Sequence, residues 1–138
     1  MFETVVVGAD ASDTAAEAVR QAIELVKVTG GRLHVVSAYK PQQFSTGGGE
    51  EHELDTGDLA DSVLADHASR ARAAGIEVQT HARSGGAAEA ICDVATEVKA
   101  DLIIVGNKGM VGARRVLGSV PNSVAHHAPC SVLIALTT

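Results

Sequence analysis

Aromatic residues are almost absent from this sequence, which has two Phe, one Tyr and no Trp among 138 residues. Proteins that hold single-stranded nucleic acid stack its bases on aromatic side chains, so this class of partner is not expected. The net charge of −6 also disfavours nucleic acid and anionic membranes as partners. With 46% hydrophobic residues, the core must consist of Val, Ile, Leu and Ala, which is typical of parallel strands buried on both faces.

The sequence also lacks the segments that mark export or membrane insertion. Its N-terminus, MFETVVVGAD, has no basic region followed by a long apolar stretch. No apolar run approaches the roughly 20 residues of a membrane span. Cys92 and Cys130 form no CxxC pair and are interpreted as small buried residues in a reducing compartment. We therefore expect a cytoplasmic protein with a single domain, residues 1–138.

Several standard site motifs are missing as well. A dinucleotide fingerprint, GxGxxG, should follow the first strand, where the sequence reads GADASD, and no GxxxxGK[ST] string occurs. His126 and His127 are adjacent, so their side chains diverge on a helix, and His34 and His81 lie in predicted strands. The sequence therefore predicts no metal site formed by protein ligands alone, and it indicates no catalytic residue.

What the chain does have is a regular alternation of strands and helices. Continuous apolar runs predict strands at 4–9, 33–39, 101–106 and 131–136, and an alternating run predicts an edge strand at 76–82. Helical spacing predicts helices between them, with a capping box at Thr14 and Glu17 in the first. The second, 58–74, has an apolar stripe of Leu59, Val63, Leu64, Ala68 and Ala71. This alternation predicts an α/β fold with a parallel sheet and helices on both faces, a three-layer sandwich.

Two segments are candidates for function. Residues 40–57 are polar, contain three consecutive glycines and predict a long flexible loop. The carboxyl ends of parallel strands are where ligands bind in such sheets. Ala9-Asp10, Ser37-Ala38 and the chain from Gly106 onward are therefore expected to converge.

The stretch GNKGMVGARRVLGS, 106–119, has the features of an anion site. The first 101 residues hold all 17 acidic residues and eight of the 11 basic ones, a net charge of −9, whereas the last 37 carry +3. Ser119 is a natural N-cap for a last helix near 120–127, and Pro121 is tolerated in its first turn. The N–H groups of Ser119, Val120, Asn122 and Ser123 would then face an anion. The alternative is that the glycines only turn a strand into a helix.

The chain resembles the universal stress protein family over nearly its whole length. The resemblance rests on VVVGADASD after the first strand, ADLIIVGNKG at the fourth, and GSVPNSVAHHAPCSVLI at the end. The ATP-binding branch of that family has the motif G-x2-G-x9-G-[ST]. Here Gly106-x2-Gly109 is followed by eight residues and then Gly118-Ser119, so the spacer is one residue short. The resemblance implies a five-stranded sheet with strand order 3-2-1-4-5.

The resemblance also implies roles for particular residues. Asp10 matches the position near the ribose or a phosphate-bound Mg²⁺, and Ser37 and Ala38 match the adenine edge. The residues that match the family's positions around the ribose and phosphates are Gly106, Gly109, Gly118 and Ser119. Position and charge add further candidates for nucleotide binding, which are Ala9, Asn107, Lys108, Gly112, Arg114, Val120, Asn122 and Ser123. Asp10 could instead cap the first helix, and Lys108, Arg114 and Arg115 could form a solvated edge of the loop.

Three functions are compatible with these observations. The first is a regulator in stress response that binds an adenine nucleotide, with ATP first and AMP or cyclic AMP as alternatives. The second is a slow ATPase or autophosphorylating protein, with Mg²⁺ on Asp10 and Ser119 or Ser123 as acceptor. The third is a dimeric interaction module without a nucleotide. Residues 131–136, SVLIAL, carry no charge, and the family resemblance places this strand at a sheet edge, so we expect a homodimer there.

Overall fold

The structure, a computed structural model, describes residues 1–40, 55–107 and 118–137. Its five strands form one parallel sheet in the order β3-β2-β1-β4-β5, which confirms the predicted fold class and strand order. The strands are β1 (Thr4–Gly8), β2 (Arg32–Tyr39), β3 (Glu77–Ser84), β4 (Leu102–Gly106) and β5 (Ser131–Ala135). The helices are α1 (Asp13–Thr29), α2 (Asp55–Ala73), α3 (Ala87–Glu97) and α4 (Ser119–His127).

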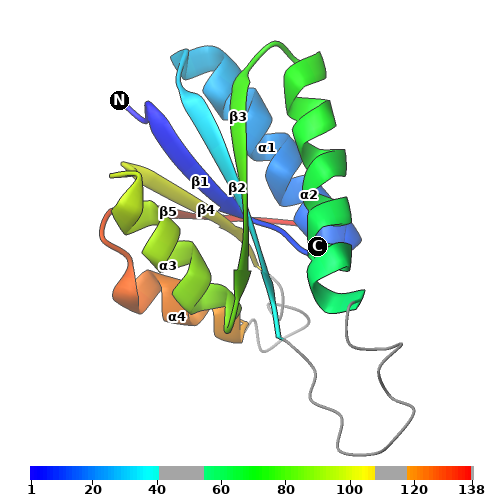
Figure 1. The fold of residues 1–138 in the computed structure, drawn as a ribbon. Helices are drawn as coiled ribbons and strands as arrows, with labels where there is room; N and C mark the ends of the chain where they lie inside the picture. The colour runs from blue at the N-terminus through cyan, green and yellow to red at the C-terminus, as the bar shows by residue number, and fades with distance from the viewer. Residues whose placement is uncertain (41–54, 108–117, 138) are drawn as a thin grey trace, which may run out of the picture.

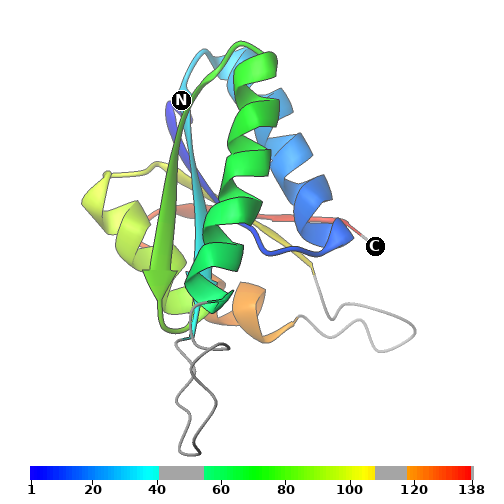
Figure 2. The same ribbon diagram turned by 45° about the vertical axis from the view of Figure 1, so that its right-hand side comes forward.

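The helices cover the two faces of the sheet in pairs. Helices α1 and α2 lie on one face and α3 and α4 on the other (Figures 1 and 2). The connections explain this division, because the chain moves from β1 to β2 and β3 in one direction and then returns past β1 to β4 and β5. Right-handed crossovers in opposite directions place their helices on opposite faces. Within the described residues, no helix is long and apolar enough to cross a membrane.

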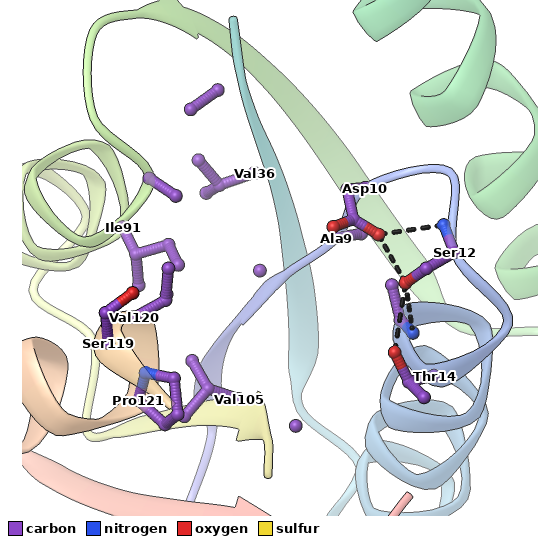
Figure 3. A pocket seen from close by; sticks show the side chains of 15 residues that line it. Ala9, Asp10, Ser12, Thr14, Val36, Ile91, Val105, Ser119, Val120 and Pro121 are labelled. Carbon is purple, nitrogen blue, oxygen red and sulfur yellow. Dashed lines mark hydrogen bonds between the residues drawn. The ribbon is translucent and has the colours of Figure 1, made fainter. Parts of the chain in front are cut away.

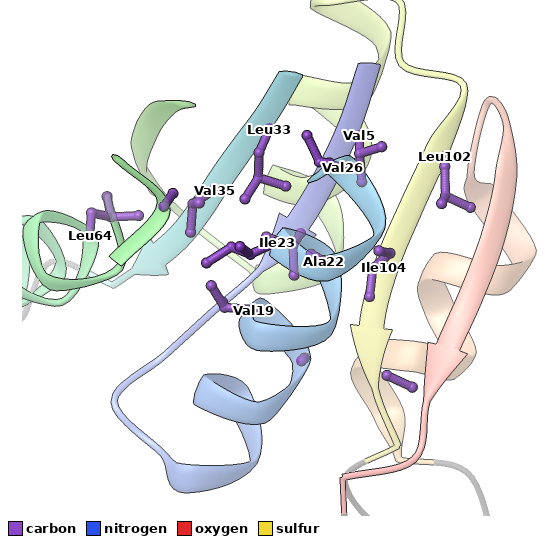
Figure 4. Packing of buried hydrophobic residues seen from close by; sticks show 14 residues of the cluster. Val5, Val19, Ala22, Ile23, Val26, Leu33, Val35, Leu64, Leu102 and Ile104 are labelled. Atoms are coloured by element: carbon purple, nitrogen blue, oxygen red, sulfur yellow. The ribbon is translucent and has the colours of Figure 1, made fainter. Parts of the chain in front are cut away.

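Two apolar clusters fill the layers on either side of the sheet. Under α1 and α2, Val19, Ile23 and Val26 of α1 pack on β1, β2 and β4 (Figure 4). On the other face, Ile91 and Val94 of α3 and Val124 of α4 pack against alternate residues of the same strands. Alternate strand residues point to opposite faces, so the three central strands are buried on both. The prediction of a Val, Ile, Leu and Ala core is confirmed.

The first helix begins differently from the sequence prediction. Its N-cap is Ser12, whose side chain accepts a hydrogen bond from the N–H of Ala15 at 3.1 Å. The predicted capping box at Thr14 and Glu17 is therefore wrong, and Glu17 instead accepts from Arg20 and Gln21. The Arg20 and Gln21 hydrogen bonds lower the pKa of Glu17 to about 2. The helix ends at Gly30, whose φ of 77° is the left-handed conformation that glycine adopts most readily.

The second helix also differs from its prediction. It begins at Asp55 rather than 58, and residues 41–54 of the predicted loop lie outside the described residues. Leu59, which the sequence placed in the apolar stripe, is 59% exposed. The buried face instead follows Ala60, Leu64, His67, Ala68 and Ala71, so a histidine occupies a core position. Leu64, Ala68 and Ala71 of the predicted stripe are buried as expected, whereas Leu59 is not part of it.

Two histidines meet on the sheet face that α3 covers. His34 of β2 and His81 of β3 share a hydrogen bond of 2.9 Å between Nδ1 and Nε2. His34 is buried, and the prediction that both are structural residues of strands is consistent with this bond. Burial lowers the pKa of both rings; His81 and Arg32 add to this effect on His34, while Glu77 opposes it. Arg83 lowers the pKa of His81 further, and Glu97 opposes it.

We predict that this histidine pair makes the protein less stable in mild acid. Both rings have folded pKa values below the ordinary 6.5, so the unfolded chain binds more protons between that value and the folded pKa. Their contribution is complete above about pH 6.5 and is lost as the pH falls further. Urea unfolding at pH 7.5 and pH 5 measures this, with His81→Gln as the comparison. An equal loss in wild type and His81→Gln would contradict the prediction.

Candidate functional site

A cavity of about 370 Å³ lies at the carboxyl ends of β1 and β4. Its walls come from the β1–α1 connection, the tip of β2, the start of α3, the end of β4 and the start of α4 (Figure 3). Strands β1 and β4 are neighbours whose following helices leave toward opposite faces, so the chain opens between them. This is the switch point of the sheet, where ligand cavities in open α/β folds are found.

One wall of the cavity is polar and belongs to the β1–α1 connection. The Oδ1 atom of Asp10 accepts from the backbone N–H of Ser12 at 2.8 Å and from its hydroxyl at 2.5 Å. The Ser12 hydroxyl also lies 3.0 Å from that of Thr14 and caps α1 (Figure 3). Asp10 is therefore held by the residue that starts the helix. The alternative prediction, that Asp10 itself caps α1, is wrong because Ser12 does so.

The opposite wall is apolar. Ile91 of α3, Val120 and Pro121 of α4, and Val105 of β4 face the cavity from the side away from Asp10 (Figure 3). Val36 of β2 and Gly8 of β1 complete it. A Cβ atom at Gly8 would collide with Cδ1 of Ile91, so glycine allows α3 to approach β1 closely here. A flat apolar group fits against this wall, while polar groups fit against the other.

The start of α4 forms the third part of the cavity. The N-cap is Gly118, and Ser119 is the first helical residue, so the prediction of Ser119 as N-cap is wrong. The N–H of Asn122 donates to the carbonyl of Gly118 at 3.0 Å, within the helix, rather than toward a ligand. By helix geometry the N–H groups with no acceptor inside the helix precede it, at Ser119 and Val120. Both residues line the cavity.

The structure brings many of the predicted site residues to this cavity, but not all. Those that line it are Ala9, Asp10, Ala38, Gly106, Ser119 and Val120. Gly118 adjoins it as the N-cap of α4, whereas Asn122 and Ser123 lie further along that helix and are not among the lining residues. Lys108, Gly109, Gly112 and Arg114 lie outside the described residues, as does Arg115. The three strand tips do converge as the sequence predicted.

Ser37 and Asn107 lie beside the cavity without lining it. Ser37 is buried and alternates with Val36 and Ala38, so its side chain points to the face of α1 and α2. Asn107 is also buried, and its Oδ1 accepts from both the N–H and the hydroxyl of Thr137, at 2.8 and 2.9 Å. Their side chains therefore have structural positions near the site.

Much of the cavity wall was not predicted from the sequence. The lining residues that were not predicted as site residues are Gly8, Ser12, Thr14, Ala15, Val36, Ala87, Ile91, Val105 and Pro121. Ser12 and Thr14 could have been found, because they are polar residues directly after Asp10 at a strand tip. Val36 follows from strand alternation once Ala38 is placed at the site. Ile91 and Ala87 could not be found, since only the packing of α3 on the sheet brings them there.

The described residues of the cavity provide few groups that could bind a metal ion in the absence of a nucleotide. No group of three or more His, Cys, Asp or Glu suited to a metal occurs in the part of the chain that the structure describes. Asp10 is the one ionisable side chain among the described lining residues. A single carboxylate fits the way proteins hold Mg²⁺ together with substrate phosphates, and it also fits a hydrogen bond from a sugar hydroxyl.

The fold and the cavity together define a parallel α/β domain with a ligand site at its switch point. The family model for the universal stress protein family matches residues 1–135, and the chain therefore belongs to this family. It is 35% identical over 144 residues to the universal stress protein Rv1636 of Mycobacterium tuberculosis, covering 99% of this chain and 98% of that protein. The resemblance stated from the motifs is confirmed.

Two solved structures of relatives extend the comparison. A universal stress protein in complex with cAMP has a TM-score of 0.78 and 34% identity, over 99% of this chain and 98% of that one. A universal stress protein from Archaeoglobus fulgidus in complex with dAMP has a TM-score of 0.69 and 26% identity, over 97% of each chain. Both likenesses extend along nearly the whole chain.

We predict that Ser12→Ala destabilises the protein by about 1 kcal/mol, the usual cost of losing a side-chain N-cap. Thr14→Val is the control, because it removes one hydroxyl contact and leaves the cap of α1 in place. The free energy of unfolding, measured by urea denaturation, should fall more for Ser12→Ala than for Thr14→Val. Superimposable unfolding curves for Ser12→Ala and wild type would show that this cap carries no stability.

Proposed function

We propose that the chain binds an adenine nucleotide in the cavity between β1 and β4 and acts as a ligand-responsive regulator. The observation that carries this proposal is the cavity itself, with an apolar wall on one side, the Asp10 carboxylate on the other and a helix start at its end. Its volume of about 370 Å³ lies within the usual range of small-molecule sites. The relatives solved with cAMP and dAMP support the same ligand class.

Each part of the nucleotide has a matching part of the cavity. The adenine would lie against Val36, Ile91 and Val120, with Ala38 at its edge. The phosphate would lie at the start of α4, where backbone N–H groups and the helix dipole favour an anion. Asp10 would accept hydrogen bonds from ribose hydroxyls, since a carboxylate close to a phosphate is repelled unless a cation lies between them. This arrangement keeps the two negative groups apart.

We propose that the bound nucleotide carries one phosphate. The glycine motif is one residue shorter than the family's ATP-binding motif, and both relatives described above hold a nucleotide with one phosphate. ATP, which the sequence placed first, would need Mg²⁺ near Asp10 to bring a longer phosphate chain past this carboxylate. Population shift between ligand-bound and free conformations would then be the means of regulation.

We predict that cAMP or AMP binds with a dissociation constant of about 10 µM. A ligand efficiency of about −0.3 kcal/mol per non-hydrogen atom, over their roughly 22 non-hydrogen atoms, gives about −7 kcal/mol. Isothermal titration with cAMP, AMP and ATP, each with and without Mg²⁺, measures the affinities, and GMP serves as the control for the base. The absence of heat from every adenine nucleotide with folded protein would refute the proposed function.

We predict that Ser119→Asp lowers the affinity about tenfold or more, because a new carboxylate at the start of α4 repels the phosphate. The stability of α4 should not fall, since acidic residues are favourable in the first turn of a helix. Asn122→Asp is the matched control: it adds the same charge to the same turn at an exposed residue that does not line the cavity. Equal losses of affinity in the two variants would indicate that the phosphate does not bind at the start of α4.

We also propose that the chain forms a homodimer through β5. This strand ends the sheet, and Leu133 and Ile134 are 40% and 37% exposed, with Leu136 at 64%. An edge strand with apolar side chains and open backbone groups is suited to association with a second copy. None of the 131–136 residues carries a charge that would oppose it.

The dimer leads to a prediction about molecular mass. Wild type should sediment at about twice the 14.1 kDa of the chain, and Ile134→Asp should sediment as a monomer because a carboxylate would be buried in the interface. Leu59→Asp is the control, since Leu59 is an exposed apolar residue on α2, away from β5. An unchanged mass for Ile134→Asp would exclude this interface.

A further inference from the structure

Gly8 and Ile91 are in close contact at the wall of the cavity. Gly8 is the last residue of β1, and Ile91 belongs to α3, which packs on that side of the sheet. A Cβ atom at Gly8 would lie 2.4 Å from Cδ1 of Ile91 and 3.2 Å from its Cγ1. The optimal separation of two carbon atoms that are not bonded is about 3.5–4.0 Å. The end of the Ile91 side chain therefore occupies the space that a side chain at residue 8 would take.

The surroundings of Ile91 are filled on one side and open on the other. Only 3% of Ile91 is exposed, and it packs in one apolar cluster with Val94 and Val124, which are fully buried. Side chains in such a core leave little room for a displaced methyl group. On its other side Ile91 faces the cavity, whose volume is about 370 Å³ (Figure 3). A group that displaces Cδ1 from its place over Gly8 should therefore turn it toward the cavity.

We propose that Ile91 is a specificity-determining residue, whose Cδ1 methyl group lies over Gly8 and limits the size of the base that the apolar wall admits. The wall accepts unsubstituted adenine and excludes a base that carries an additional alkyl group on the side of Ile91. The identity of the base rests on the proposed function, whereas the control of cavity size by this pair does not. The pair also accounts for a glycine at the end of β1, since glycine at such a place often marks a close approach of another group.

Crystal structures of the free protein test the control of cavity size without any ligand. In Gly8→Ala we expect Cδ1 of Ile91 to turn into the cavity. Ile91→Val removes only this methyl group, so in the double variant Gly8→Ala/Ile91→Val the new Cβ atom should take its place and leave the cavity at its original size. A Cδ1 atom that turns away from the cavity, or a helix α3 that moves while the cavity keeps its size, would overturn the proposal.

Titration calorimetry tests the specificity. The ligands are AMP and analogues of AMP that carry a methyl group on the exocyclic amine or on one of the two C–H carbons of adenine. Gly8→Ala should lower the affinity for AMP about tenfold, the effect of one methyl group in a fitted apolar pocket, and the double variant should recover it. Ile91→Val should raise the affinity for at least one methylated analogue about tenfold relative to AMP.

Ile103→Val is the matched control. It removes the same methyl group from the same apolar cluster, but Ile103 of β4 is fully buried and is not among the lining residues. Its ratio of affinities for the methylated analogues and AMP should equal that of wild type. Unchanged ratios in Ile91→Val, or equal changes in Ile91→Val and Ile103→Val, would show that Ile91 only fills the core. If wild type binds no adenine nucleotide, the proposed function fails, and the position of Ile91 in Gly8→Ala still decides whether the pair sets the size of the cavity.

Discussion

The arrangement of this protein depends on the pairing of β1 with β4 in the middle of one parallel sheet. Both strands are buried on both faces, and the chain leaves their carboxyl ends toward opposite faces, to α1 and to α4. The two connections diverge at this switch point, and the cavity lies between them. The cavity therefore follows from the strand order, and the residues at the two strand tips become its walls whatever ligand it holds.

The sequence predicted the layers and the strand order because buried parallel strands leave a strong pattern of continuous Val, Ile and Leu. It also located the strand tips, since Ala9-Asp10, Ala38 and Gly106 directly follow such runs. The prediction was less accurate where the start of a helix had to be placed to within one or two residues. The N-cap of α1 lies at Ser12 rather than Thr14, and α4 begins at Ser119 with Gly118 as its cap. Capping residues of similar propensity stand side by side at both places, so only the backbone geometry distinguishes them.

His67 illustrates a different limit of prediction from sequence. Its spacing from Ala60, Leu64 and Ala71 is that of one helical face, so the pattern was present but a polar residue was not counted as part of an apolar stripe. The groove that it lines together with Asp10, by contrast, joins residues that are far apart along the chain and belong to a helix and a strand connection. No periodicity encodes such a shared groove. It arises because α1 and α2 share one face of the sheet, which places the middle of α2 beside the start of α1.

The end of β4 joins the cavity to the outer strand of the sheet. Gly106 lines the cavity, and the next residue, Asn107, donates its N–H to the carbonyl of Ala135 and accepts from Thr137 through Oδ1. A Cβ atom at Gly106 would lie 3.3 Å from the side chain of Thr137, so the two chain segments are in close contact. The backbone that borders the cavity is therefore bonded to the end of β5, the strand with exposed Leu133 and Ile134. The border of the cavity and the outer strand of the sheet are therefore parts of one continuous network of buried hydrogen bonds.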